Sequence, residues 1–154
     1  MNRLTPDRLR DLLPASSIVL DGSATNQEDA IRQVGALLVA AGRVGPEYVE
    51  AMIEREAAVS TFVGDGVALP HGTSAVKVAV VADGLAVLRL AEAIDWGGER
   101  VSLVIGIAAR GRGYIALLGQ LASALLEIGG AEALSGAKTT EEVYAALGGV
   151  IDSA

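Results

Sequence analysis

The residues that this 154-residue sequence lacks already narrow its chemistry. It has no cysteine, which excludes disulfide bonds, a thiolate nucleophile and thiolate metal ligands. With one Phe, one Trp and three Tyr, its core has to be built mainly from aliphatic side chains. It also has a single histidine, His71, so any imidazole chemistry depends on that residue.

Basic charge and long apolar runs are also scarce. The formal net charge of −7 argues against a nucleic-acid partner, because phosphate backbones are bound by clustered Lys and Arg. The longest apolar run, "VSLVIGIAA" at 101–109, is far shorter than the roughly 20 residues of a membrane-spanning helix. The first residues, "MNRLTPDRLRDLLP", carry charges throughout and lack the apolar stretch of a secretion signal. We therefore expect a cytoplasmic protein with no direct membrane insertion.

Helix-like and strand-like patterns alternate along the chain, without a linker or repeat, which predicts one domain over residues 1–154. Thr25 and Glu28 have the spacing of a capping box at the start of one helix. The expected helices are 5–14, 25–42, 46–59, 113–129 and 139–148. The expected strands are 17–20, 74–84, 86–90 and 101–109, with a hairpin-like turn inside 60–72. This order predicts an α/β fold: a single domain with a central mixed β-sheet covered by helices on both sides.

His71 lies in "VALPHG", and several kinds of chemistry can be set aside there. No carboxylate lies nearby in sequence to complete a metal site, so neither a metal nor a cofactor is expected. The chain also lacks the G-x-S-x-G pattern of a serine hydrolase and both common phosphate-binding glycine patterns. Two interpretations remain: an ordinary surface histidine, or a nucleophile. A neutral imidazole, with an unperturbed pKa of roughly 6.5, attacks phosphorus well near neutral pH.

The segment "EAAVSTFVGDGVALPHG", residues 56–72, resembles the active-site signature of enzyme IIA domains of the sugar phosphotransferase system, mannitol/fructose type. That signature starts with an acidic or amide residue and ends in apolar-Ala-apolar-Pro-His and a small residue. The positions that fill it are Glu56, Val63, Gly64, Val67, Ala68, Leu69, Pro70, His71 and Gly72. Two further segments, "YVEAMIERE" and "LVIGIAAR", resemble the mannitol-type domains in particular.

This resemblance implies a function. His71 would accept a phosphoryl group on its tele nitrogen from phospho-HPr and pass it to a cysteine of a IIB component. The membrane component IIC would then take up the sugar, of mannitol or fructose type. Arg55, sixteen positions before His71, would stabilise the phosphoryl oxygens, and Thr61, Gly72 and Tyr114 would complete the phosphate environment.

The sequence departs from the family at Tyr114, where many members have a second histidine in a G-x-x-H context. A tyrosine hydroxyl can donate a hydrogen bond but carries no positive charge at neutral pH. Arg110 or Arg112 could restore that charge. Two alternatives to a transport role stay open: a regulatory phosphoprotein similar to the nitrogen-regulatory IIA proteins and, because of Tyr114, a IIA-like binding module that takes up no phosphate.

Two predictions concern the surroundings of His71. Phe62, Val63 and Leu69 are expected to form an apolar rim on which two partner proteins dock in turn. Trp96, in "DWGG", is expected to be a packing anchor in a turn.

Overall fold

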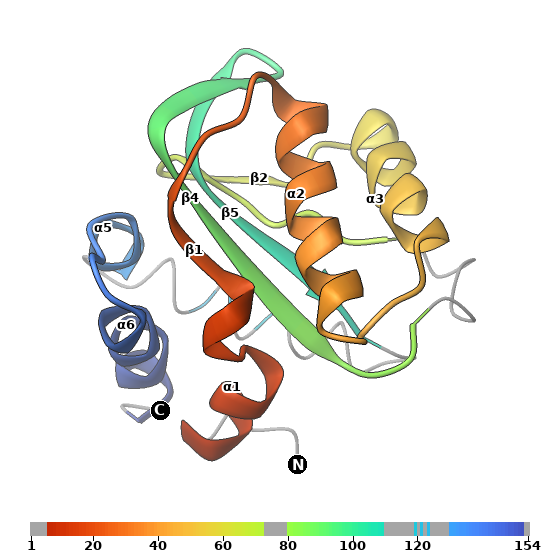
Figure 1. Cartoon of the computed structure of the whole chain (residues 1–154). Coiled ribbons are helices and arrows are strands. Elements are labelled where there is room, and N and C mark those ends of the chain that lie inside the picture. Colours follow the sequence, from red (N-terminus) through yellow and green to blue (C-terminus); the bar gives the residue numbers. More distant parts are fainter. Residues whose placement is uncertain are drawn as a thin grey trace.

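A mixed β-sheet with helices on both of its faces forms the framework of the molecule (Figure 1). The computed structural model describes residues 6–72, 80–109, 119, 121, 123 and 130–152. The α/β class and the helices on both faces are confirmed. No helix in these described ranges is long and apolar enough to cross a membrane.

The sheet contains five strands within the described residues, in the order β1-β4-β5-β3-β2. They are β1 (Ile18–Gly22), β2 (Phe62–Gly64), β3 (Val67–Ala68), β4 (Gly84–Trp96) and β5 (Glu99–Ala108). β1 runs parallel to β4 and β3 runs parallel to β5, whereas β4–β5 and β2–β3 are antiparallel pairs. The predicted mixed sheet is therefore correct, and β3 lies inside it, next to long β5.

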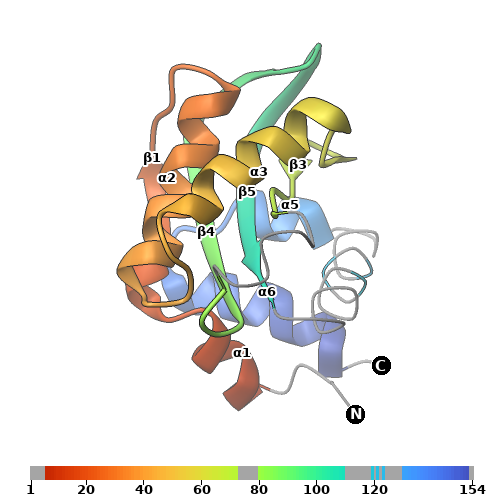
Figure 2. The ribbon, with the colours of Figure 1, turned by 90° about the vertical axis from the view of Figure 1, so that its right-hand side faces the viewer.

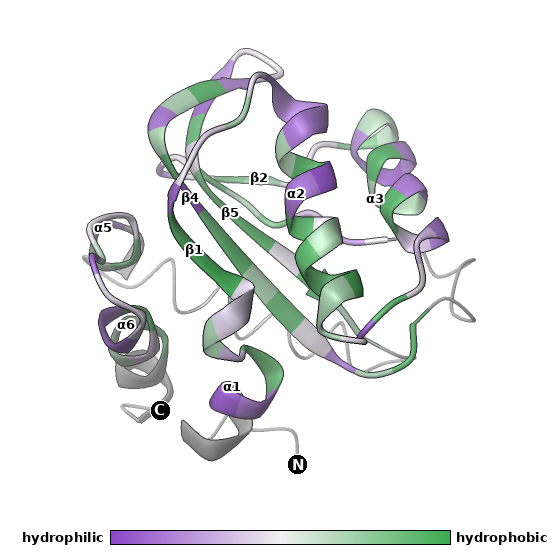
Figure 3. Ribbon diagram, viewed as in Figure 1, coloured by the Kyte–Doolittle hydropathy of each residue, from purple (hydrophilic) through white to green (hydrophobic). Residues whose placement is uncertain are grey.

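Each face of the sheet is covered by its own group of helices. α2 (Gln27–Ala40) and α3 (Glu47–Ala58) cover one face, and α1 (Pro6–Leu12), α5 (Gly130–Ser135) and α6 (Thr140–Asp152) lie over the other (Figures 1 and 2). A short 3-10 helix, Ala15–Ser17, joins α1 to β1. β4 and β5 contain long apolar stretches (Figure 3), because both of their faces are buried over much of their length.

The β4–β5 hairpin differs from the prediction. A strand was expected over 86–90, but β4 continues to Trp96 and turns into β5 through Gly97 and Gly98. Both glycines have positive φ, 61° and 100°, a region that side chains with a Cβ rarely adopt. Of the strand expected at 74–84, residues 74–79 lie outside the described residues. Val80 forms a single bridge with Val44.

The start of α2 is one residue later than predicted. The N-cap is Asn26, whose side-chain oxygen accepts a hydrogen bond from the Asp29 backbone N–H at 2.8 Å. The Asp29 carboxylate in turn accepts one from the Thr25 backbone N–H at 2.9 Å. The expected Thr25–Glu28 capping box is thus wrong. Asn26 and Asp29 have the same spacing, and Asn is a better N-cap than Thr.

Candidate functional site

His71 lies just after the end of β3, and its side chain is buried. It pairs with Ile107 of β5 in an isolated parallel bridge, and Pro70 O accepts a hydrogen bond from Ile107 N at 2.9 Å. The residue is only 6% exposed. It is therefore not the ordinary surface histidine that a lone His in a loop suggests.

One hydrogen bond sets the tautomer of His71. Its Nδ1 lies 2.9 Å from Leu69 O. A carbonyl oxygen can only accept, so Nδ1 must carry the proton and donate it. In the neutral imidazole the lone pair is then on Nε2, which is the tele nitrogen.

The surroundings also set the charge of the ring. The pKa of His71 is lowered from its usual value, mainly because burial disfavours the imidazolium. The hydrogen bond to Leu69 opposes this, the positive charge of Arg55 lowers the pKa further, and the negative charge of Glu56 raises it. The net lowering keeps the ring neutral, and therefore nucleophilic, at neutral pH.

Arg55 lies in the last turn of α3 and is half-buried. Its Nη1 donates a hydrogen bond to Val59 O at 2.6 Å, just beyond the end of the helix. Its charge acts on His71, so the fold brings the two predicted residues into one electrostatic environment. A guanidinium carries several N–H donors in one plane and suits an incoming phosphoryl group.

Gly72 is required by a close approach to Tyr48. A Cβ at Gly72 would lie 2.5 Å from Tyr48 Cε1, a distance that no side chain tolerates. The Gly72 N–H donates to the Tyr48 hydroxyl at 2.8 Å, and that hydroxyl donates to Ile107 O at 2.7 Å. Tyr48 was missed in the sequence, where the buried face of the helix at 46–59 gave no sign that its hydroxyl reaches the histidine loop.

Thr61 contacts Glu56. Its backbone N–H donates to Glu56 Oε2 at 2.9 Å, and its hydroxyl donates to Glu56 Oε1. The same Oε2 accepts a hydrogen bond from Trp96 Nε1 at 2.9 Å. The Thr61 hydroxyl proton is thus directed at Glu56. Trp96 is 1% exposed and is an anchor, at the end of β4 rather than in the turn.

The expected apolar rim is only partly present. Val63 is 39% exposed and Phe62 is half-buried, so both reach the surface. Leu69 is only 1% exposed and packs in the hydrophobic core. The prediction that it forms part of the rim is therefore wrong. Val59, at the end of α3, is 64% exposed and was not predicted.

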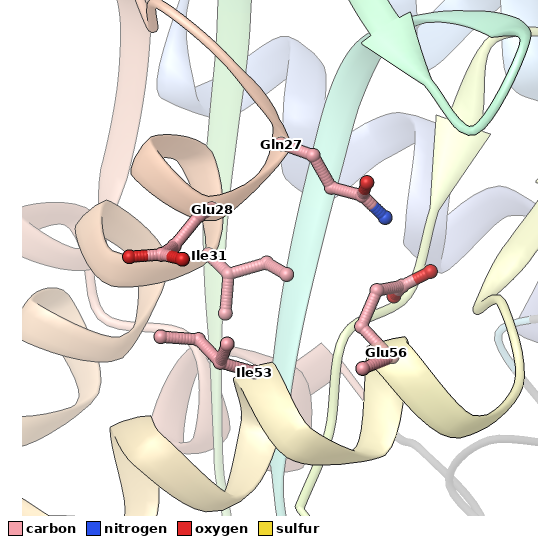
Figure 4. Close-up of a pocket in the computed structure, with 6 residues that line it drawn as sticks. Gln27, Glu28, Ile31, Ile53 and Glu56 are labelled. Atoms are coloured by element: carbon pink, nitrogen blue, oxygen red, sulfur yellow. The ribbon is translucent and has the colours of Figure 1, made fainter.

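A pocket of about 210 Å³ lies between α2 and α3 (Figure 4). Its lining residues are Gln27, Glu28, Ile31, Ile53, Glu56 and Ala57. Glu56 is the lining residue that also belongs to the surroundings of His71.

Within the described ranges no three His, Asp or Glu side chains converge as metal ligands would. Tyr114, Arg110 and Arg112 lie outside the described residues.

The fold and the site together define a class of protein: a small α/β domain that presents a neutral histidine at the end of a buried strand. Comparison with known proteins gives the family. Residues 11–149 match the sequence model of the family described as "Phosphoenolpyruvate-dependent sugar phosphotransferase system, EIIA 2". The chain belongs to this family and is a phosphotransferase component of the enzyme IIA type, which confirms the resemblance seen in the sequence.

Relatives and solved structures refine this result. A mannitol-specific phosphotransferase enzyme IIA component of Staphylococcus aureus (strain MRSA252) is 38% identical over 135 residues, which is 88% of this chain and 94% of the relative. The fold is similar to enzyme IIAMTL in its complex with phosphorylated enzyme IIBMTL from Escherichia coli, with a TM-score of 0.83 and 36% identity over 90% and 99% of the two chains. The nitrogen regulatory protein IIA-Ntr from Neisseria meningitidis shares the fold at a TM-score of 0.74 and 27% identity, over 89% and 97%.

Proposed function

We propose that this protein accepts a phosphoryl group from phospho-HPr on Nε2 of His71 and passes it to a cysteine of a IIB component. The observation that carries the proposal is the bond from Nδ1 to Leu69 O, because it puts the lone pair on Nε2. The lowered pKa of His71 supports it, since a protonated ring would have no lone pair to offer. The partner system is that of mannitol-type sugar uptake, with IIC as the membrane component.

In the first step, the His71 Nε2 lone pair attacks phosphorus and forms a new N–P bond. The N–P bond of phospho-HPr breaks, and its electron pair returns to the donor's imidazole nitrogen. The Nδ1 proton of His71 stays in place throughout, so the phosphorylated ring becomes cationic. Its bond to Leu69 O then strengthens, because a charged donor makes the stronger hydrogen bond.

In the second step, a thiolate of IIB attacks the same phosphorus atom. An S–P bond forms, the Nε2–P bond breaks, and the neutral ring is restored without any proton transfer. Both steps pass through a loose transition state whose charge lies on the phosphoryl oxygens. We assign the stabilisation of that charge to the Arg55 guanidinium. Gly72 lets the loop lie against the Tyr48 ring, which helps to hold His71 in place, and Thr61 acts through its contact with Glu56.

Exposed apolar side chains next to the site suit partners that bind in turn. Val59 is exposed at the end of α3, and Val63 is exposed on β2, which lies at one end of the five described strands. A small apolar patch with a polar rim is typical of a transient interface. The E. coli neighbour, solved with phosphorylated IIBMTL, supports IIB as the acceptor.

A regulatory role is the second candidate. The structural likeness to IIA-Ntr, at 27% identity, supports a regulatory role, but the mannitol-specific relatives, at 38% identity, favour transport. The binding module that takes up no phosphate is the third reading, and it predicts no labelling at all. We place the protein in the cytoplasm with these partners, because its donor HPr and its acceptor IIB both work inside the cell.

The test is reconstitution with phosphoenolpyruvate, enzyme I and HPr, followed by intact mass spectrometry at mildly alkaline pH. The native protein is expected to gain the mass of one phosphoryl group, and His71→Ala is expected to gain none. A mannitol-type IIB is then added, and the phosphoryl group is expected to leave the protein for the IIB cysteine. A nitrogen-regulatory type would be labelled by HPr but would keep its phosphoryl group when IIB is added. No labelling, with a known IIA domain labelled in the same tube, would overturn the proposal.

A further inference from the structure

An unbroken series of hydrogen bonds connects the Glu56 carboxylate to the His71 ring. The Thr61 N–H donates to Glu56 Oε2 at 2.9 Å, and Thr61 O accepts from Leu69 N at 3.0 Å. Leu69 O then accepts from His71 Nδ1 at 2.9 Å. The N–H and C=O of one residue belong to different peptide units, so the series acts by fixing the positions of Thr61 and Leu69 and not by polarising one bond through the next.

The start of this series is fixed firmly. Three donors meet the two Glu56 oxygens: the Thr61 N–H and Trp96 Nε1 on Oε2, and the Thr61 hydroxyl on Oε1. The three residues are buried, with exposed fractions of 7% for Glu56, 6% for Thr61 and 1% for Trp96. An ionised carboxylate is an acceptor only, and it matches this set of donors. Figure 4 shows the Glu56 side chain leaving the last turn of α3.

We propose that Glu56 is a positioning residue for phosphoryl transfer at His71, acting through Thr61 and Leu69 without touching the phosphoryl group. This inference rests on the proposed function. The carboxylate holds the Leu69 carbonyl in line with Nδ1, and its negative charge favours the cationic ring that exists while Nε2 carries phosphorus. Arg55, its neighbour on α3, acts on the phosphoryl oxygens instead.

A purely structural role is the rival explanation. Glu56 also joins the end of α3 to the end of β4, through Trp96, and any loss of that junction could lower stability alone. The two roles differ in what the unphosphorylated His71 ring senses. A structural tie has no reason to change its titration, whereas a carboxylate whose negative charge acts on the ring does.

Glu56→Gln separates the two roles because it removes the charge and can keep the contacts. The amide oxygen can take the place of Oε2 and accept from Thr61 N and Trp96 Nε1. The amide nitrogen can take the place of Oε1 and donate to the Thr61 hydroxyl oxygen. Glu54→Gln is the matched control, since Glu54 is exposed on the same helix and the charge change is identical.

The readout is the NMR titration of His71, whose imidazole signals are unambiguous because it is the only histidine in the chain. Arg55 and Glu56, both from α3, are the charged groups among the described residues that shift its pKa. Glu56→Gln is expected to lower the His71 pKa relative to wild type. It should also reduce kcat for labelling by phospho-HPr about tenfold, with KM unchanged, because the lost charge acts on the transition state and not on docking. Glu54→Gln should change neither.

The proposal is overturned if the Glu56→Gln variant shows the same His71 titration and the same labelling rate as the Glu54→Gln variant. If Glu56→Gln does not fold, Thr61→Val decides, because it removes one of the three donors that hold the Glu56 carboxylate in place and keeps the backbone hydrogen bonds. Thr61→Val is expected to shift the titration and the rate in the same direction, by less. Wild-type behaviour of both its titration and its rate would overturn the proposal too. Wild-type protein that takes up no phosphoryl group at all would instead mark the failure of the proposed function.

Discussion

At the scale of single residues, two opposite charges from the same helix act on the pKa of His71. Arg55 lowers the pKa of His71, whereas Glu56 raises it. We expect Arg55→Gln to raise the His71 pKa in an NMR titration, because a nearby cation is removed. The same variant should slow labelling by phospho-HPr about a hundredfold, the usual cost of losing one transition-state donor. Arg32→Gln, on the exposed surface of α2, serves as the control, and an equal loss of rate there would contradict this role for Arg55.

The contact between Gly72 and Tyr48 gives a second prediction at this scale. Gly72→Ala puts a methyl group 2.5 Å from the Tyr48 ring, which should lower the free energy of unfolding by about 1–3 kcal/mol. Tyr48→Phe removes the hydroxyl that accepts from the Gly72 N–H and donates to Ile107 O, at a similar cost. Urea unfolding measures both. If Gly72→Ala is as stable as the wild type, the loop can move away from Tyr48 without cost, and the prediction is wrong.

The signature in the sequence was sufficient to find His71 and its neighbours in the loop, because those residues are contiguous. It could not reveal the Glu56–Trp96 hydrogen bond, which joins residues 40 positions apart. It also gave Leu69 an exposed position, since a short apolar segment does not show which of its residues face the core. The sequence placed Thr61 in the phosphate environment, but it could not show the contact with Glu56, because that contact depends on the turn of the chain between α3 and β2.

At the scale of elements, the cap of α2 provides a direct comparison. Asn26→Ala is expected to lower the free energy of unfolding by about 1 kcal/mol, because the Asp29 N–H loses its acceptor. Thr25→Ala should cost less, since it removes only a hydroxyl that lies 3.3 Å from Asp29, and the backbone bond at Thr25 remains. Chemical denaturation of the two variants shows which of them loses more free energy of unfolding. A larger loss in Thr25→Ala would restore the capping box expected from the sequence.

Helices were easier to locate from the sequence than strands. The periodicity over 25–42 and 46–59 matches α2 and α3 closely, because a long amphipathic face is a strong signal. The length of β4 was missed because its character changes along the strand: residues 84–90 are nearly all buried and form an apolar run, whereas residues 91–93 are more exposed and interrupt it. The pairing of β3 with β5, which places His71 beside Ile107, depends on contacts between distant segments that no local pattern contains.

At the scale of the whole molecule, burial of the neutral His71 ring makes stability depend on pH. The pKa of His71 is lowered in the folded protein, so the unfolded chain binds the proton more readily as the pH falls below about 6.5. The free energy of unfolding should therefore decrease as the pH falls from 6.5 through the folded-state pKa, by at most about 1.4 kcal/mol per pH unit from this one group. Above pH 6.5 the group contributes no slope.

The control for this prediction is His71→Gln, which keeps every carboxylate of the chain and removes the one imidazole. Urea unfolding of both proteins across pH 5 to 7.5 should give a steeper fall for the wild type. Identical slopes would contradict the lowered pKa of His71.

The α/β class itself could be predicted from alternating patterns, because helices on both faces make the strands apolar throughout. The strand order could not.

The central claim is that Nε2 of His71 carries the phosphoryl group while Nδ1 keeps its proton and its bond to Leu69 O. A long-range ¹H–¹⁵N correlation spectrum of the ¹⁵N-labelled protein, phosphorylated by phosphoenolpyruvate, enzyme I and HPr, tests it directly, since the chain has one imidazole. The account predicts phosphorus coupling at Nε2 and a protonated Nδ1. Phosphorus on Nδ1, or a ring unchanged after a reaction that labels a known IIA domain, would contradict it.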